Sequence, residues 1–403
     1  MISSDRMRRA AESIPGLVLI ASLLTTVVFL TTPVTESNRG FDFDGVFYAA
    51  MAGSPLINNS YAHVAPWCYR ILTPAVVHLL PWDTLTSFRA SAFASNIAAL
   101  CLLFAILRRL RFAPGSCWLG LVLYLGVFWT AKFSFYSPAY IDNQTELFLL
   151  GIIYLTITSQ YVLLTAILML GAIQKESLAV FAVFAVAHLI REKGRRPDFR
   201  TGALSAALIG LPLAAVAIVR AIVPAPDEYS AAQATLAELR HLGDWHTWPV
   251  MAQSMFSGLG LLPVLLVASP RVWLTFLRAH FEWAVYLAIA VALLFGGVDK
   301  ARLLLYALPL VVILSLCVVD AMRGATSAKL FAAWTGVLLA LHLFIGGHLT
   351  PMGAYGDYLA RMVPEHAGDR YLPYLARNGM IAALFGALTL GLGISSSRRG
   401  DSL

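Results

Sequence analysis

Four short polar groups, set between long apolar runs, hold the residue types that could do chemistry. They are centred on Asp42 and Asp44, on Asp142, on Lys175 and Glu176, and on Asp299 and Arg302. Ionisable residues beside apolar segments are costly unless they are paired or used. Carboxylates that face Arg70, Lys175 and Arg302 would suit a reaction that needs a general base and a cationic site for an anionic phosphate leaving group.

Each group also has a purely structural interpretation. Asp44 could be the N-cap of a helix in a solvated loop, and Asp142 or Asn143 could cap a later helix. The Lys175–Glu176 pair could form an ion pair between neighbouring helices, and Arg302 could extend its charge to the membrane interface. The residue types alone leave both interpretations open.

Composition places these groups in a membrane protein. Of the 403 residues, 59% are hydrophobic and 13% are charged, whereas soluble domains have about 25% charged residues. Apolar runs predict spans near 14–32, 87–107, 116–134, 145–158, 161–173, 177–190, 202–223, 250–268, 280–297, 301–319, 328–347 and 379–395. We therefore expect an all-α bundle of about twelve spans, in one transmembrane domain (1–403) without a separate soluble domain. The stretch 145–190 fits three passes, or one pass and a re-entrant pair.

The basic residues predict the orientation of these spans. They gather at Arg6, Arg8 and Arg9; Arg108, Arg109 and Arg111; Arg191, Lys193, Arg195, Arg196 and Arg200; Arg271 and Arg278; Arg323 and Lys329; Arg398 and Arg399. With both termini cytoplasmic, these clusters obey the positive-inside rule, and all four polar groups fall on the outer face of a plasma membrane. The net charge of +7 then reports topology and does not indicate nucleic-acid binding.

The first outer loop, 33–86, has helical features of its own. Its apolar residues recur at helical spacing, at Phe43, Val46, Phe47, Ala50 and Met51. This pattern predicts an amphipathic helix at the membrane interface, with Asp44 and Tyr48 sharing its other face. A second short helix is expected from Pro74 to Leu80, because proline is tolerated in a first turn.

Several short motifs together resemble a known family. They are Asp44-Gly45-Val46-Phe47-Tyr48 with Ala52, Tyr69-Arg70-Ile71-Leu72-Thr73-Pro74, Lys175-Glu176, and Asp299 with Arg302 and Pro309. This set resembles the bacterial membrane glycosyltransferases of the GT-C superfamily. The resemblance implies transfer of a sugar, with inversion, from a polyprenyl-phosphate donor to a lipid-linked or glycan acceptor at the extracytoplasmic face.

The resemblance also implies roles for individual residues. Asp44 resembles the catalytic base of that family, with Asp42 as the rival assignment. The donor phosphate is expected at Arg70, Lys175 and Arg302. The residues expected to bind substrate are Tyr48, Tyr69, Asp142, Glu176 and Asp299. No required metal or other cofactor is expected, because His246 and His348 lack partners at metal-ligand spacing.

A multi-pass secondary transporter or lipid flippase is the alternative function. Twelve helices would suit it, and the Lys175–Glu176 pair could couple transport to an ion. Transporters usually have two related halves with charged sites near the membrane midplane. The sequence shows no internal repeat, and its charged groups gather at one predicted face.

Overall fold

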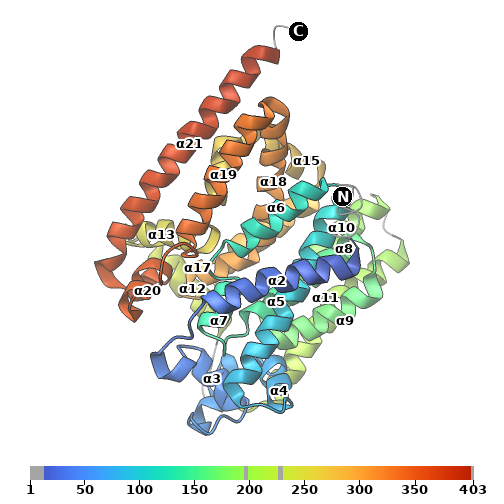
Figure 1. Ribbon diagram of the computed structural model, residues 1–403. Helices are drawn as coiled ribbons and strands as arrows, with labels where there is room; N and C mark the ends of the chain where they lie inside the picture. The colour runs from blue at the N-terminus through green and yellow to red at the C-terminus, as the bar shows by residue number, and fades with distance from the viewer. Residues whose placement is uncertain (1–12, 195–197, 226–229, 401–403) are drawn as a thin grey trace. The chain divides into compact units, whose positions relative to one another are not determined.

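The computed structural model describes residues 13–194, 198–225 and 230–400, and it is helical without strands throughout these residues (Figure 1). The chain forms two compact units. The first unit comprises Met1–Pro114 and Thr130–Tyr229, and the second comprises Gly115–Trp129 and Ser230–Leu403. The all-α prediction is therefore confirmed for the described part of the chain.

Six stretches among the described residues are long and apolar enough to cross a membrane. They are α2 (Ile14–Thr31), α5 (Thr84–Arg109), α11 (Phe199–Ile222), α18 (Leu308–Ala325), α19 (Ala328–Ile345) and Gly368–Leu392, which includes most of α21 (Leu372–Gly400). A helix of 18 residues such as α2 spans about 27 Å, close to the thickness of the hydrocarbon core. The chain has the character of a membrane protein, and the number of twelve spans stays a prediction.

Parts of the orientation prediction fall outside the described residues. These are Arg6, Arg8, Arg9, Arg195 and Arg196, together with the side chains of Arg398 and Arg399. The assignment of cytoplasmic and outer loops stays a prediction.

The expected span 250–268 is a bent helix pair, and the expected span 280–297 corresponds to the second helix of another bent pair, whose first helix lies in an expected inner loop. α13 (Thr247–Leu259) and α14 (Leu262–Ala268) meet at 105°, and α15 (Pro270–Ala279) and α16 (Phe281–Leu293) meet at 111°. Counted as one span each, these pairs bring the candidate spans to eight. Gly260 lies at the first break with φ +60°, a conformation that glycine adopts without a steric penalty.

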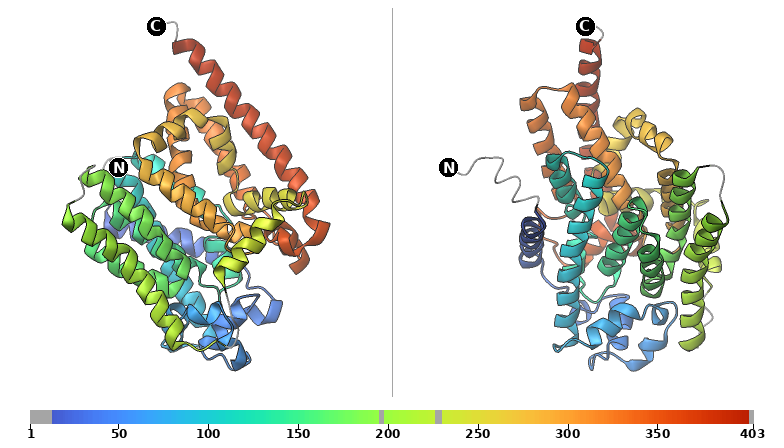
Figure 2. Two further views of the ribbon diagram at one scale, coloured as in Figure 1. Left: turned by 180° about the vertical axis from the view of Figure 1, so that it is seen from behind. Right: turned by 90° about the vertical axis from the view of Figure 1, so that its right-hand side faces the viewer.

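The first unit is a row of packed helices. Its helices beyond the first loop, other than α5 and α11, are α7 (Ala131–Tyr136), α8 (Asp142–Ile157), α9 (Tyr161–Gln174), η4 (Glu176–Phe181) and α10 (Ala182–Lys193). The expected span 177–190 therefore begins as a 3-10 helix, which continues into α10. α5 packs against α2 and α8, α8 packs against α9, and α9 packs against α11; Figure 2 shows α9 and α11 (green) side by side.

Helix starts in this unit follow their capping residues. The Asp83 carboxylate accepts the Thr86 N–H at 3.1 Å. With this cap, α5 begins at Thr84, three residues before the start of the expected span 87–107. Asp198 accepts the Thr201 N–H at 2.8 Å and begins α11 in the same way. Such caps satisfy one of the N–H groups that a helix start leaves without an intrahelical partner.

The first loop contains both expected short helices, with shifted starts. They are α3 (Gly45–Met51) and α4 (Leu72–His78), joined by the short 3-10 helices η2 (Asn59–His63) and η3 (Trp67–Tyr69); η1 (Ser37–Gly40) precedes them. Phe43 lies outside α3, and α4 begins two residues before Pro74. Phe41, Tyr48, Val77, Phe88 and Ile141 belong to one buried cluster. This cluster ties both short helices to α5 and to the start of α8.

The second unit has more helical structure than expected. α12 (Ala231–His241) lies in the expected loop 224–249, and α20 (Tyr355–Met362), η6 (Pro364–His366) and η7 (Gly368–Tyr371) lie in the expected loop 348–378. The start of the expected span 301–319 is a short α17 (Lys300–Leu303) followed by η5 (Leu304–Tyr306), so the long helix α18 begins only at Leu308. α14 packs against α18 and α21, and α15 packs against α18.

His342 fixes three segments of this unit to one another. Its ring is fully buried in α19, its Nε2 lies 2.8 Å from the Leu123 carbonyl of α6 (Pro114–Leu125), and the Leu261 N–H donates to its Nδ1 at 3.2 Å. The ring is therefore a neutral imidazole with its proton on Nε2. A side chain at Gly126 or Gly260 would collide with this ring.

We predict that His342→Leu destabilises the protein by about 3 kcal/mol, because it leaves the buried Leu261 N–H and Leu123 carbonyl without partners. Thermal unfolding in detergent measures the effect. His241→Leu, at an exposed position at the end of α12, is the matched control and should change the unfolding temperature little. Equal unfolding temperatures for both variants would contradict this role of His342.

Candidate functional site in the first unit

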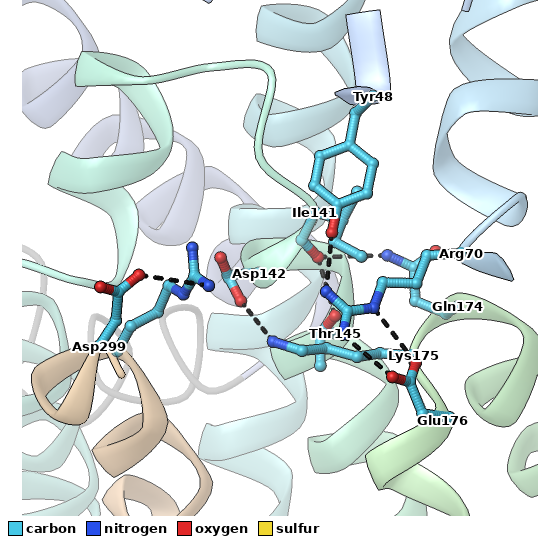
Figure 3. Close-up of polar contacts among 10 residues, drawn as sticks. Tyr48, Arg70, Ile141, Asp142, Thr145, Gln174, Lys175, Glu176 and Asp299 are labelled. Atoms are coloured by element: carbon cyan, nitrogen blue, oxygen red, sulfur yellow. Dashed lines mark hydrogen bonds and ion pairs between the residues drawn. The ribbon is translucent and has the colours of Figure 1, made fainter. Parts of the chain in front are cut away.

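Arg70 is the centre of a buried ion-pair network in the first unit. Its Nε and Nη2 donate to Oε2 and Oε1 of Glu176 at 3.1 and 3.0 Å, and its Nη1 donates to the Tyr48 hydroxyl at 3.0 Å (Figure 3). The two parallel bonds to one carboxylate form the bidentate geometry that arginine favours. Arg70 is 9% exposed, so the pair lies largely out of water.

The environment sets the charges of this network. Burial alone would lower the pKa of Arg70, but the nearby Glu176 carboxylate outweighs this effect, so the pKa of Arg70 lies above its ordinary value. Burial alone would raise the pKa of Glu176, but the Arg70 cation outweighs this effect, so the pKa of Glu176 lies below its ordinary value. Burial raises the pKa of Tyr48 to about 12. Near neutral pH the network therefore holds a cation, an anion and a neutral phenol.

Lys175 forms a second buried ion pair, next to the first along the chain. Its ammonium lies 2.9 Å from Oδ1 of Asp142, and both side chains are less than one-tenth exposed. Lys175 and Arg70, two of the residues expected to hold a phosphate, are thus each paired with a carboxylate. A phosphate that bound here would have to share these cations with Asp142 and Glu176.

Gln174 belongs to the same site, although the sequence did not single it out. Its Oε1 accepts bonds from the N–H and the hydroxyl of Thr73 at 3.2 and 2.8 Å, and its Nε2 donates to the Ile141 carbonyl at 3.2 Å. The three consecutive side chains Gln174, Lys175 and Glu176 therefore bind the first loop and the start of α8. A glutamine beside two ionisable residues in an apolar chain was the available clue.

Asp42 and Asp44 have different environments. Asp42 is 3% exposed, and its Oδ1 accepts bonds from the Ser37 hydroxyl at 3.1 Å and from the Phe43 N–H at 3.0 Å. Asp44 is half-buried at the N-cap of α3, but its side chain makes no capping bond. Its N–H donates to the Tyr140 hydroxyl at 3.2 Å, which ties this turn to the start of α8.

The backbone between the two carboxylates is strained. Phe43 has φ +38°, an unusual value for a bulky residue. Such strain costs on the order of 1–3 kcal/mol and persists only where the surroundings impose it, which is often at a functional site. Here it separates the environments of Asp42 and Asp44, because one carboxylate is buried in the loop and the other begins a helix.

The first turn of α8 is buried and polar. The capping prediction for Asp142 and Asn143 is wrong, because the N-cap position is Ile141 and neither side chain caps the helix. Every side chain from Asp142 to Glu146 is buried, at 3–7% exposure. The sequence did not show this, because capping residues are usually solvated.

Tyr69, also expected to bind substrate, packs under a cation. The guanidinium of Arg220, near the end of α11, lies 5.3 Å from the centre of its ring. Cation–π contacts of this kind are favourable where the cation is partly desolvated. The contact fastens the first loop to α11.

Asp299 and Arg302 lie in the second unit. Asp299 Oδ2 is 3.4 Å from Arg302 Nη2, and its Oδ1 is 3.1 Å from Nε2 of His366. Burial raises the pKa of the neighbouring Glu365 to about 7, and its Oε1 accepts the Ser254 hydroxyl and the Lys300 N–H at 2.8 and 2.9 Å. The hydrogen bond to Asp299 raises the pKa of His366. The sequence singled out neither Glu365 nor His366.

Comparisons with protein families, with characterised proteins and with solved structures find no match to this chain. Within residues 13–194, 198–225 and 230–400, no three His, Cys, Asp or Glu side chains are grouped so that they could hold a metal ion.

We predict that Glu176→Gln destabilises the protein by about 3 kcal/mol, because it leaves the buried Arg70 cation without its carboxylate. Unfolding in detergent is the measurement. The double variant Arg70→Met with Glu176→Met should recover much of this loss, since it removes both charges. A single variant as stable as the parent would show that the pair contributes little.

Stability should fall as the pH rises from 5 to 8. Glu365 and His366 both have folded-state pKa values above their unfolded values, so the folded state binds more protons in this range. We expect Glu365→Gln to reduce the fall in unfolding temperature between pH 5 and 8, since glutamine does not titrate. Asp369→Asn, at an exposed carboxylate, is the control; an equal pH dependence in both variants would contradict the assignment.

Proposed function

We propose that this protein is a membrane glycosyltransferase of GT-C type that transfers a sugar from a polyprenyl-phosphate donor to a lipid-linked or glycan acceptor, with Asp44 as the general base. The observation that carries the proposal is the difference between the environments of Asp42 and Asp44. Asp42 is buried and bonded to its own loop, whereas Asp44 is half-buried at the start of α3, beyond a strained residue.

The chemical step follows from this assignment. The Asp44 carboxylate takes the proton of the acceptor hydroxyl as that oxygen bonds to the anomeric carbon of the sugar. The bond between the anomeric carbon and the phosphate oxygen breaks on the opposite side, and the phosphate leaves with the electron pair. The configuration at the anomeric carbon is inverted, and no redox cofactor takes part.

Fixed cations would stabilise the leaving phosphate. Lys175 has three N–H donors, so its ammonium could bind a phosphate oxygen while it keeps its bond to Asp142. Arg70 already makes two hydrogen bonds to Glu176 and one to Tyr48, so its main role is to position the first loop. A phosphate-binding role for Arg302 is proposed on the basis of the sequence resemblance alone. A substrate-binding or positioning role is proposed for five further residues: Tyr48, Tyr69, Asp142, Glu176 and Asp299.

The cellular setting is proposed on the same basis. The enzyme would lie in a bacterial-type plasma membrane, with both termini cytoplasmic and the site on the extracytoplasmic side. The positive charges of the expected inner loops support this orientation. A required metal ion is not part of the proposed mechanism.

A secondary transporter or flippase is the second candidate function. The two sharply bent helix pairs of the second unit favour it, because transporters often bind their substrates at broken helices. The ion pairs Arg70–Glu176 and Lys175–Asp142 lie in the first unit, away from these breaks along the chain. His280 and the buried Glu282 lie at the second break, so the preference for the transferase rests on the sequence resemblance.

We predict that Asp44→Asn lowers transfer at least about 100-fold, because a general base typically contributes that much or more, and leaves the unfolding temperature nearly unchanged. Transfer is measured with purified protein in nanodiscs, with a panel of radiolabelled polyprenyl-phosphate sugars as donors and crude membrane lipids as acceptors. Asp42→Ala should instead lower the unfolding temperature, since Asp42 holds the Ser37 hydroxyl and the Phe43 N–H.

A well-folded Asp44→Asn protein with substantial transfer would overturn the assignment of the base. Solute or lipid flux in liposomes, with no transfer from any donor of the panel, would favour the transporter.

A further inference from the structure

Asn143 has a buried carboxamide without a partner. It lies in the first turn of α8 and is 5% exposed. Neither its Oδ1 nor its Nδ2 makes a hydrogen bond to any described residue. A buried polar group without a partner costs about 1–3 kcal/mol, so a folded protein seldom keeps one unless something else bonds to it.

Three side chains next to Asn143 each make a hydrogen bond within the protein. Asp142 binds Lys175 at 2.9 Å, Gln144 Nε2 donates to the Ser91 hydroxyl at 2.8 Å, and the Thr145 hydroxyl donates to the Ile141 carbonyl at 2.9 Å. Asp142 and Gln144 thus bind other segments, and Thr145 bonds within its own turn. The Oε1 of Gln144 is also buried without a partner, so Asn143 differs from these three in that its whole carboxamide is unbonded.

Asn96 shows how the same unit treats a structural asparagine. It is 2% exposed, and its Nδ2 donates to the Ser134 hydroxyl at 2.8 Å and to the Ala92 carbonyl at 2.9 Å. The two asparagines match in residue type and burial, and both lie in helices of the first unit, Asn96 in the interior of α5 and Asn143 in the first turn of α8. They differ in whether their amides are bonded, and this makes Asn96 the reference for Asn143.

We propose that Asn143 is a ligand-binding residue that bonds to the hydroxyl groups of the sugar carried by the donor. A carboxamide offers donors and an acceptor side by side, and a sugar hydroxyl both donates and accepts. The first turn of α8 also has backbone N–H groups without intrahelical partners. The identification of the ligand as a sugar rests on the proposed function.

The local charge favours a neutral ligand at this position over an anion. Asp142, the adjacent charge, is paired with Lys175, and the next ionisable side chain along α8 is the buried Glu146. The uncharged Asn143 amide therefore offers hydrogen bonds beside a paired cation and a second carboxyl group, a setting that does not attract an anion. A polyhydroxyl group meets these conditions better than a phosphate, which would need an unshared cation.

Stability provides the first part of the test. Asn143→Leu replaces an unbonded amide with an apolar side chain of similar size, so its unfolding temperature should equal or exceed that of the parent. Asn96→Leu breaks two hydrogen bonds at the same burial and should lower it. A comparable loss of stability in both variants would show that the Asn143 amide is bonded within the protein, and would overturn the proposal.

Binding provides the second part and does not depend on turnover. A panel of short-chain polyprenyl-phosphate sugars and the matching polyprenyl phosphate without sugar are titrated onto the full-length protein in nanodiscs. The parent should bind one sugar-bearing lipid more tightly than the sugar-free lipid, and Asn143→Leu should lose about tenfold of that preference, the equivalent of one hydrogen bond. Both proteins should bind the sugar-free lipid equally.

The outcomes separate this inference from the proposed function. If the parent shows no preference for any sugar, or if Asn143→Leu keeps the full preference, the role of Asn143 is overturned. If the preference is lost in Asn143→Leu but the parent transfers no sugar to any acceptor, Asn143 binds sugar and the transferase function is wrong. Asp44→Asn should keep the sugar preference in this assay.

Discussion

The first unit depends on the rule that a charge removed from water must be paired. Arg70 with Glu176 and Lys175 with Asp142 are two such pairs, and they are adjacent because Lys175 and Glu176 are consecutive residues. Each pair joins the Lys175–Glu176 turn to a different segment, one to the first loop and one to the start of α8. Removal of one partner would leave a buried charge, so the geometry of the whole site is held by charge pairing.

The same rule gives a physical account of the first loop. Burial of Tyr48 and its contact with Arg70 place α3 against the ion-pair network. The chain reaches that position through the strained turn at Phe43. Strain that the buried contacts impose can hold a carboxylate in a fixed position at the start of α3, as a positioned base requires.

The second unit is organised by a neutral contact. His342 joins α19 to α6 and to the break between α13 and α14, and the small residues Gly126 and Gly260 leave room for its ring. The bend at this break leaves backbone groups without helical partners, which must find other partners in an apolar environment. A histidine with one donor and one acceptor meets this need without a charge.

The sequence by itself determined the helical class, the apolar stretches and the polar groups, because hydrophobic runs and isolated charges are local features of a chain. It placed α3 and α4 in the first loop to within a few residues. It did not determine that Lys175 pairs with Asp142, that Gln174 joins their segments, or that Asn143 is buried without a partner. These facts depend on which segments pack together. Burial and pairing are properties of the packed chain, so only the tertiary structure decided them.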